Sequence, residues 1–300
     1  MFKKILIIIL FFLVSSLSVA GANYNLITDV GISAKSISLG GIGSFNDSAD
    51  VIFDNPAGLS SIKNNSLSIF QTTVMQEVHY YNVSYAGKTP IGTFGVGFMN
   101  AYVTGIPYTG LNGNNETFIE SYYDYNNYIY KIGYAYNLTK NLALGASLVG
   151  YNLTFHDISG SGNDFDIGCI LSFDNLDISF VVQQGLNSNI KYNNDGIERL
   201  QNRYSLSAKY QISDVKLFGQ LRTQELKYLY AAAVSYNPEF LKIFELNFGY
   251  KQFLVLGEVR NGITVGLGLL FDSIKFHYAF EKSDHFEHNN KNYFTIAFDF

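Results

Sequence analysis

The sequence predicts an all-β protein: a transmembrane antiparallel β-barrel of about fourteen strands with an N-terminal plug segment in its lumen. Three observations predict it: few charges among many aromatic residues, apolar residues at every second position, and connections that alternate between short and long. Of the 300 residues, 47% are hydrophobic and 16% aromatic, yet only 15% are charged, against roughly 25% in soluble domains. A barrel whose strands are apolar on one face gives this combination.

Charge and cysteine content exclude several other classes. The formal net charge is −5 and there is one cysteine, so neither a nucleic-acid binder, which is usually basic, nor a disulfide scaffold is expected. The 23 Tyr and 25 Phe residues argue against disorder, because disordered chains contain few aromatics.

Residues 1–22 have the features of a secretory signal peptide. Lys3 and Lys4 precede an apolar run over residues 5–14, and small residues at 20–22 supply a cleavage site. The apolar run is short for a membrane span, which needs roughly 20 residues. We therefore predict that the signal is cleaved and the chain exported.

From residue 66 to residue 300, apolar and polar residues alternate as they do on the two faces of a strand. We predict strands that begin near residues 66, 77, 92, 127, 141, 164, 176, 203, 215, 227, 243, 262, 274 and 291. The charged residues share the polar face, which we assign to the lumen because Arg or Lys facing lipid costs roughly 2–4 kcal/mol. The predicted lumen wall includes Lys131, Asp166, Arg203, Lys209, Arg222, Lys275, His277 and Glu281.

The predicted connections are short at one end of the barrel and longer at the other. Long connections are expected at 108–126, 157–163, 186–202, 254–261 and 284–290. Transmembrane barrels have this asymmetry, with short turns in the periplasm and long loops outside. Aromatic residues that precede the short turns predict an interfacial girdle of Tyr85, Tyr136, Phe173, Tyr210, Tyr236 and Phe271.

The last strand ends with Phe298 and Phe300 on one face. A terminal aromatic on an alternating strand resembles the signal read by the outer-membrane barrel assembly machinery; an edge strand that ends in Phe by chance is the alternative. We expect the assembly machinery and outer-membrane lipid as partners, and a Gram-negative type of outer membrane as the location.

The segment 23–65 does not alternate and contains two motifs. The first is Gly-rich, with Gly40, Gly41 and Gly43, and the second is Asn55-Pro56-Ala57-Gly58-Leu59. Together they resemble the N-terminal signature of FadL-like outer-membrane proteins, most closely the PorV/PorQ family. A Gly-rich segment before the first strand is expected to fold into the lumen, since glycine permits close backbone approach. It would act either as a hatch that gates the lumen or as a turn needed only for folding.

The resemblance implies one of two functions. PorV/PorQ barrels assist protein export or surface attachment through type IX secretion by binding secreted proteins. The alternative is a FadL-like channel for the uptake of hydrophobic small molecules, and a purely structural barrel is a third possibility.

Residues capable of catalysis or metal binding are sparse. His285 and His288 flank Glu287 without the supporting spacing of a known metal site, so we predict no metal and no cofactor. His277 has neighbours of both charges and is assigned to a polar lumen network rather than to general-base chemistry. We predict no enzymatic activity. The Tyr-rich stretch 108–128 is expected either to contact a partner or ligand at the cell surface or to pack across the barrel mouth.

Overall fold

The computed structural model describes residues 30–74, 77–255, 257–284 and 290–300. The signal peptide and the His285/His288 pair lie outside the described residues. Fourteen strands form the barrel: β1 (Asn65–Val74), β2 (Val78–Thr89), β3 (Gly92–Leu111), β4 (Thr117–Thr139), β5 (Leu142–Phe155), β6 (Ile158–Ser172), β7 (Leu176–Gln183), β10 (Arg203–Ile212), β11 (Val215–Gln224), β12 (Lys227–Tyr236), β13 (Phe244–Val255), β14 (Glu258–Leu270), β15 (Ile274–Ser283) and β16 (Lys291–Asp299).

These strands close into an antiparallel barrel in which neighbours in sequence are neighbours in space. The barrel closes where β16 pairs with β1, with Asp299 opposite Ser66. Between β7 and β10 the chain forms a small hairpin of β8 (Asn189–Tyr192) and β9 (Ile197–Arg199), and β8 pairs with the start of β6. The predicted fold class is confirmed.

Side chains alternate between a buried lumen face and an exposed outer face. Ile132, Leu148 and Phe294 point outward with 64%, 69% and 60% of their surface exposed, while their neighbours Lys131 and Ser147 are buried. All six aromatics of the predicted girdle are exposed. The outer surface is thus an apolar band, as a lipid-facing wall requires.

Several predicted loops are instead strand. The stretch 108–126 is mostly the continuation of β3 and β4, and 157–163 belongs mainly to β6. In the same way, 254–255 belong to β13 and 258–261 to β14, and 186–202 carries β8 and β9. The physical reason is that both faces of a strand beyond the membrane meet water. Apolar and polar residues then no longer need to alternate, although the backbone hydrogen bonds between the strands continue.

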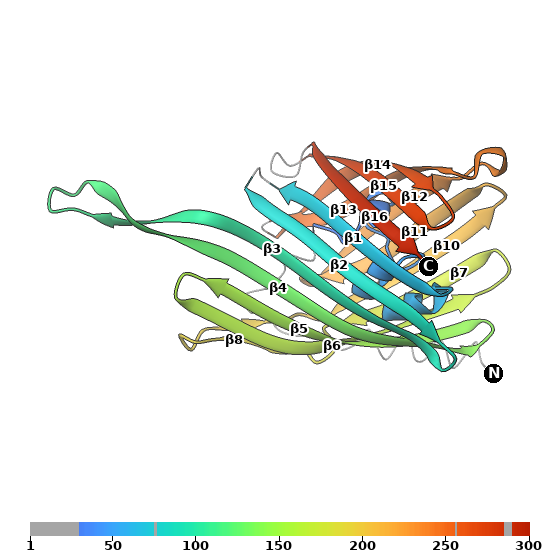
Figure 1. The fold of residues 1–300 in the computed structure, drawn as a ribbon, viewed down its shortest axis with the longest axis horizontal. Helices are drawn as coiled ribbons and strands as arrows, with labels where there is room; N and C mark the ends of the chain where they lie inside the picture. The colour runs from blue at the N-terminus through green and yellow to red at the C-terminus, as the bar shows by residue number, and fades with distance from the viewer. Residues whose placement is uncertain (1–29, 75–76, 256, 285–289) are drawn as a thin grey trace.

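The N-terminal part of the described chain, residues 30–64, lies inside the barrel and is called the lumen segment here. It contains α2 (Ala34–Ser38) and the 3₁₀ helices η1 (Ala49–Phe53) and η2 (Pro56–Ser61), drawn in blue within the barrel in Figure 1. α2 contacts β13 to β16, while η2 contacts β3 to β6. The segment therefore spans the lumen. No helix among the described residues is both long and apolar enough to cross a membrane.

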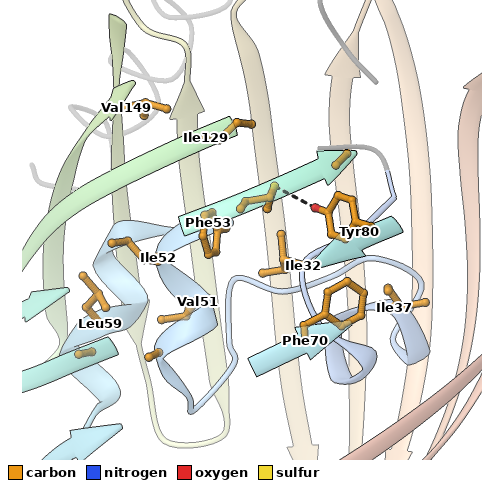
Figure 2. Close-up of a cluster of buried hydrophobic side chains, with 14 of the residues drawn as sticks. Ile32, Ile37, Val51, Ile52, Phe53, Leu59, Phe70, Tyr80, Ile129 and Val149 are labelled. Atoms are coloured by element: carbon orange, nitrogen blue, oxygen red, sulfur yellow. Dashed lines mark hydrogen bonds between the residues drawn. The ribbon is translucent and has the colours of Figure 1, made fainter. Parts of the chain in front are cut away.

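The core lies between the lumen segment and the inner wall. Figure 2 shows Ile37 and Ile52 from the segment in one cluster with Phe70, Tyr80 and Ile129 from the strands. Within it, the Tyr80 hydroxyl donates to Met99 Sδ at 2.9 Å. The lumen is thus filled by a packed interior at this level.

Candidate functional site in the lumen

The Asn-Pro-Ala-Gly-Leu motif attaches the lumen segment to the wall. Asn55 is fully buried; its Oδ1 accepts from the backbone N–H of Ala57 at 2.9 Å and caps η2. Its Nδ2 donates to Ser179 Oγ on β7 at 2.9 Å. Pro56 begins η2, a position where its missing N–H costs nothing. Leu59 is fully buried in the core.

Glycines in the barrel strands and in the lumen segment allow the two to approach closely. A Cβ on Gly145 of β5 would lie 2.2 Å from the backbone nitrogen of Ala57, and one on Gly266 of β14 would lie 2.2 Å from Ser38 Cβ. Within the segment, Gly40 has a φ of +67° beside the backbone of Tyr250, a conformation that favours glycine. Gly43 packs against Asp54, and Gly58 against Val51.

Ion pairs join the other half of the segment to β15 and, through Lys35 and Glu245 at 3.8 Å, to β13. Asp47 binds Lys35 Nζ at 2.9 Å and Lys275 Nζ at 3.0 Å, and Lys275 also binds Asp299 at 2.8 Å. Burial would raise the pKa of Asp47, but Lys35 and Lys275 overcome this and hold its pKa well below its usual value. Asp47 is therefore ionised at neutral pH and bridges the lumen segment to β15.

A second polar cluster surrounds the carbonyl of Phe53. Lys131 Nζ donates to this oxygen at 3.0 Å and pairs with Asp166 at 2.5 Å, and Gln183 Nε2 also donates to Phe53 O at 2.8 Å. Asp166 accepts from the backbone N–H of Gln184 at 3.0 Å. Of the wall residues predicted from sequence, Lys131 thus binds the lumen segment, and Asp166 pairs with Lys131.

The other predicted wall residues also point inward. Lys209 pairs with Asp177 at 2.5 Å, Glu281 pairs with Lys251 at 2.8 Å, and His277 lies 3.8 Å from Glu245. Among the described residues, the buried Nε2 of His277 has no hydrogen-bond partner. The wall is a network of paired charges.

Arg203 and Arg222 line a small cavity, about 60 Å³, together with Asp54, Lys131 and Asp166. The Oδ2 atom of Asp54 is buried there without a hydrogen bond. Burial, reinforced by the nearby Asp50 carboxylate and opposed by Lys131 and Arg222, raises the pKa of Asp54 to about 7. The cavity has room for water but is far below the roughly 300 Å³ at which ligand pockets begin.

Sequence reasoning missed Lys35, Asp47 and Asp54. These residues lie in a segment without periodicity, so no pattern marked which of its side chains face the wall. One signal was available. The segment was predicted to enter a lumen in which basic residues outnumber acidic ones, so its acidic residues could have been expected to pair with the wall. Among the described residues, no group of three or more His, Cys, Asp or Glu side chains is placed to hold a metal ion.

Comparison with known proteins places the chain in a family. Residues 151–300, half of the chain, match the family described as type IX secretion system membrane protein PorP/SprF. The chain belongs to the PorP/SprF family. The type IX family matched is therefore PorP/SprF, whereas the N-terminal motifs resemble PorV/PorQ. No curated protein matches the chain.

Solved FadL-type barrels share the fold of this PorP/SprF protein. The CymD monoaromatic hydrocarbon channel has a TM-score of 0.63 at 12% identity, covering 92% of this chain and 99% of its own. The Pseudomonas putida toluene transporter TodX has a TM-score of 0.59 at 14% identity, covering 89% of this chain and 96% of its own. A Pseudomonas aeruginosa FadL homologue has a TM-score of 0.57 at 10% identity, covering 87% of this chain and 96% of its own. At these identities the likeness shows the fold, and with the family it places the chain in the outer membrane.

Proposed function

We propose that this PorP/SprF protein assists the export or surface attachment of proteins through type IX secretion by binding secreted proteins. The family match over residues 151–300 carries the proposal. The lumen segment, which packs across the barrel interior, supports it, because a barrel occupied in this way offers its outer mouth and extensions to a protein.

The cavity beside Asp54 is unsuited to an apolar ligand in this conformation. A benzene molecule occupied an engineered apolar cavity of roughly 150 Å³, whereas this cavity measures about 60 Å³ and is lined by Arg203, Arg222 and Lys131. Placing an apolar ligand there would displace the partners of buried charges, which is costly.

We further propose that the lumen segment is a fixed closure rather than a hatch. Nine large apolar side chains of the segment are almost fully buried: Ile32, Ile37, Leu39, Ile42, Val51, Ile52, Phe53, Leu59 and Ile62. Burying each is worth roughly 1.5–3 kcal/mol, so displacing the whole segment in every transport cycle would be very costly. The ion pairs of Asp47 and the hydrogen bonds of Asn55 add to this cost.

The FadL-like channel is the second candidate, favoured by the shared fold with CymD and TodX. Under this function a hydrophobic small molecule would need a route around the lumen segment.

Deletion of the gene tests the proposal. Surface proteolysis followed by mass spectrometry should show that a set of exported proteins leaves the cell surface and accumulates in the periplasm, and the full chain should restore them. An unchanged surface proteome, together with slower uptake of a monoaromatic hydrocarbon, would instead support the channel. Heat-modifiable migration in gels verifies that the restored protein is a folded barrel.

A further inference from the structure

The hairpin of β3 and β4 continues well beyond the barrel, and its outer part, residues 103–124, is called the ribbon here. β3 pairs with β2 up to Tyr102, and β4 pairs with β5 from Tyr125 onward. Within the described residues, the two strands of the ribbon pair only with each other. Figure 1 shows the ribbon projecting from the end opposite the C-terminus. At about 3.3 Å per residue, the part of β3 from 103 to 111 spans roughly 30 Å.

The two free edges of the ribbon differ. The β3 edge contains Pro107, which has no N–H and blunts an edge against pairing. The β4 edge, residues 117–124, contains no Pro, Lys or Arg, the residues that ordinarily protect an edge strand. Along it, Phe118, Ile119 and Tyr122 are 45%, 51% and 65% exposed. The β4 edge is therefore open to another strand.

The ribbon is acidic. It carries Glu116, Glu120 and Asp124 and no basic residue, a formal charge of −3. None of these three carboxylates forms an ion pair within the described part of the chain. Glu120 lies over Gly110, and Asp124 accepts from the backbone N–H of Gly105 at 2.9 Å. The negative charge is thus left for a partner to neutralise.

The base of the ribbon is held by aromatic contacts. His156, in the turn between β5 and β6, stacks on Tyr108 with ring centroids 4.6 Å apart and meets Tyr123 edge-on at 5.3 Å. Tyr123 also contacts Phe155 at 5.2 Å. These contacts fix the direction of the ribbon and lower the entropy that a partner would have to overcome.

We propose that the β4 edge of the ribbon, residues 117–124, adds a strand from a secreted protein, and that this strand is an extended segment rich in Lys or Arg. The inference rests on the proposed function and names where and how the secreted protein binds. Strand addition uses the unpaired backbone for affinity, and alternate side chains give specificity. A second copy of the ribbon is disfavoured because it would place like charges opposite each other.

Site-specific photo-crosslinking in intact cells tests this proposal on the full chain. A p-benzoylphenylalanine at Tyr122 should form adducts with exported proteins through peptides that contain Lys or Arg. The same group at Leu148, which faces lipid, is the matched control and should give no such adducts. Glu116→Gln, Glu120→Gln and Asp124→Asn together should reduce the Tyr122 adducts about tenfold, as expected for three rim charges.

Three results would overturn the proposal: adducts with lipid alone, adducts with a second copy of the chain, or adducts unaffected by neutralisation. A chain in which 104–123 is replaced by Asn-Gly separates the two claims. If it still retains exported proteins, the ribbon is not the binding edge although the proposed function stands. If the intact chain retains none, the proposed function itself fails.

Discussion

Gly266 and Gly262 face the lumen from the same strand, β14, and differ in what lies opposite them. A Cβ on Gly266 would lie 2.2 Å from Ser38 Cβ, whereas one on Gly262 would make ordinary contacts at 3.4 Å. We predict that Gly266→Ala lowers the free energy of unfolding by roughly 1–3 kcal/mol through overpacking, while Gly262→Ala leaves it nearly unchanged. Urea unfolding in lipid vesicles measures both. Equal effects would show that α2 does not pack here.

Asn55 makes two buried hydrogen bonds: one caps η2 within the lumen segment, and the other crosses from the segment to Ser179 on β7. Asn55→Ala removes the cap of η2 and leaves Ser179 without its donor, so we expect a loss of about 2 kcal/mol in the free energy of unfolding. Asn114→Ala, in an exposed turn, is the matched control and should change little. A loss no larger than that of the control would contradict the docking described for this motif.

The raised pKa of Asp54 makes the stability of the folded protein depend on pH near neutrality, whereas the depressed pKa of Asp47 does not. The pKa of Asp54 is raised to about 7 by burial and by Asp50, so the folded protein binds a proton that the unfolded chain releases near pH 4. Stability should therefore fall as pH rises from about 4 to 7 and then level off. The pKa of Asp47 is depressed, so its contribution is lost only in acid.

Asp54→Asn should remove the decline between about pH 4 and pH 7. Hydrogen exchange of residues 31–62 at several pH values measures it. A decline that persists unchanged in the variant would assign the effect to another group.

At the scale of elements, the lumen segment and the ribbon should differ in their dynamics. We predict that amides of residues 31–62 exchange about as slowly as those of the barrel strands, because the segment is packed on both sides. Amides of residues 103–124 should exchange much faster, since each ribbon strand has one solvent-exposed edge. Hydrogen exchange with mass spectrometry on the same sample compares them directly. Fast exchange in the lumen segment would instead support a hatch.

The elements that cross the membrane could be predicted from the sequence, and those outside it could not. Alternation placed the start of β1, β3, β7 and β10 within a residue, because lipid on one face and a polar interior on the other enforce it. β4 begins at Thr117, ten residues before its predicted start near 127, because the ribbon meets water on both faces.

The same distinction applies to the candidate site. The alternation of polar and apolar residues along the strands assigned Lys131, Asp166 and Lys275 to the lumen wall. It could not identify the residues of the lumen segment that this wall contacts. Phe53 O, Lys35 and Asp47 lie in a stretch of short helices and turns. Each of them contacts a strand residue more than 70 positions away, namely Lys131, Glu245 and Lys275 respectively. The tertiary fold, and no local pattern, determines these pairings.

At the scale of the whole molecule, the protein is an outer-membrane PorP/SprF barrel with a segment packed across its lumen and an acidic ribbon at one end. The two candidate functions use the same barrel but differ in the ligand: a channel would bind hydrophobic small molecules, and a secretion protein would bind exported proteins. The filled lumen and the free edge of β4 both favour the second.

Purification of the tagged mature protein from its own outer membrane in mild detergent, with mass spectrometry of both proteins and lipids, tests this most directly. The account predicts exported proteins that share one type of targeting domain and no stoichiometric small molecule. A fatty acid or other apolar compound bound at one per barrel, with no exported protein, would contradict it.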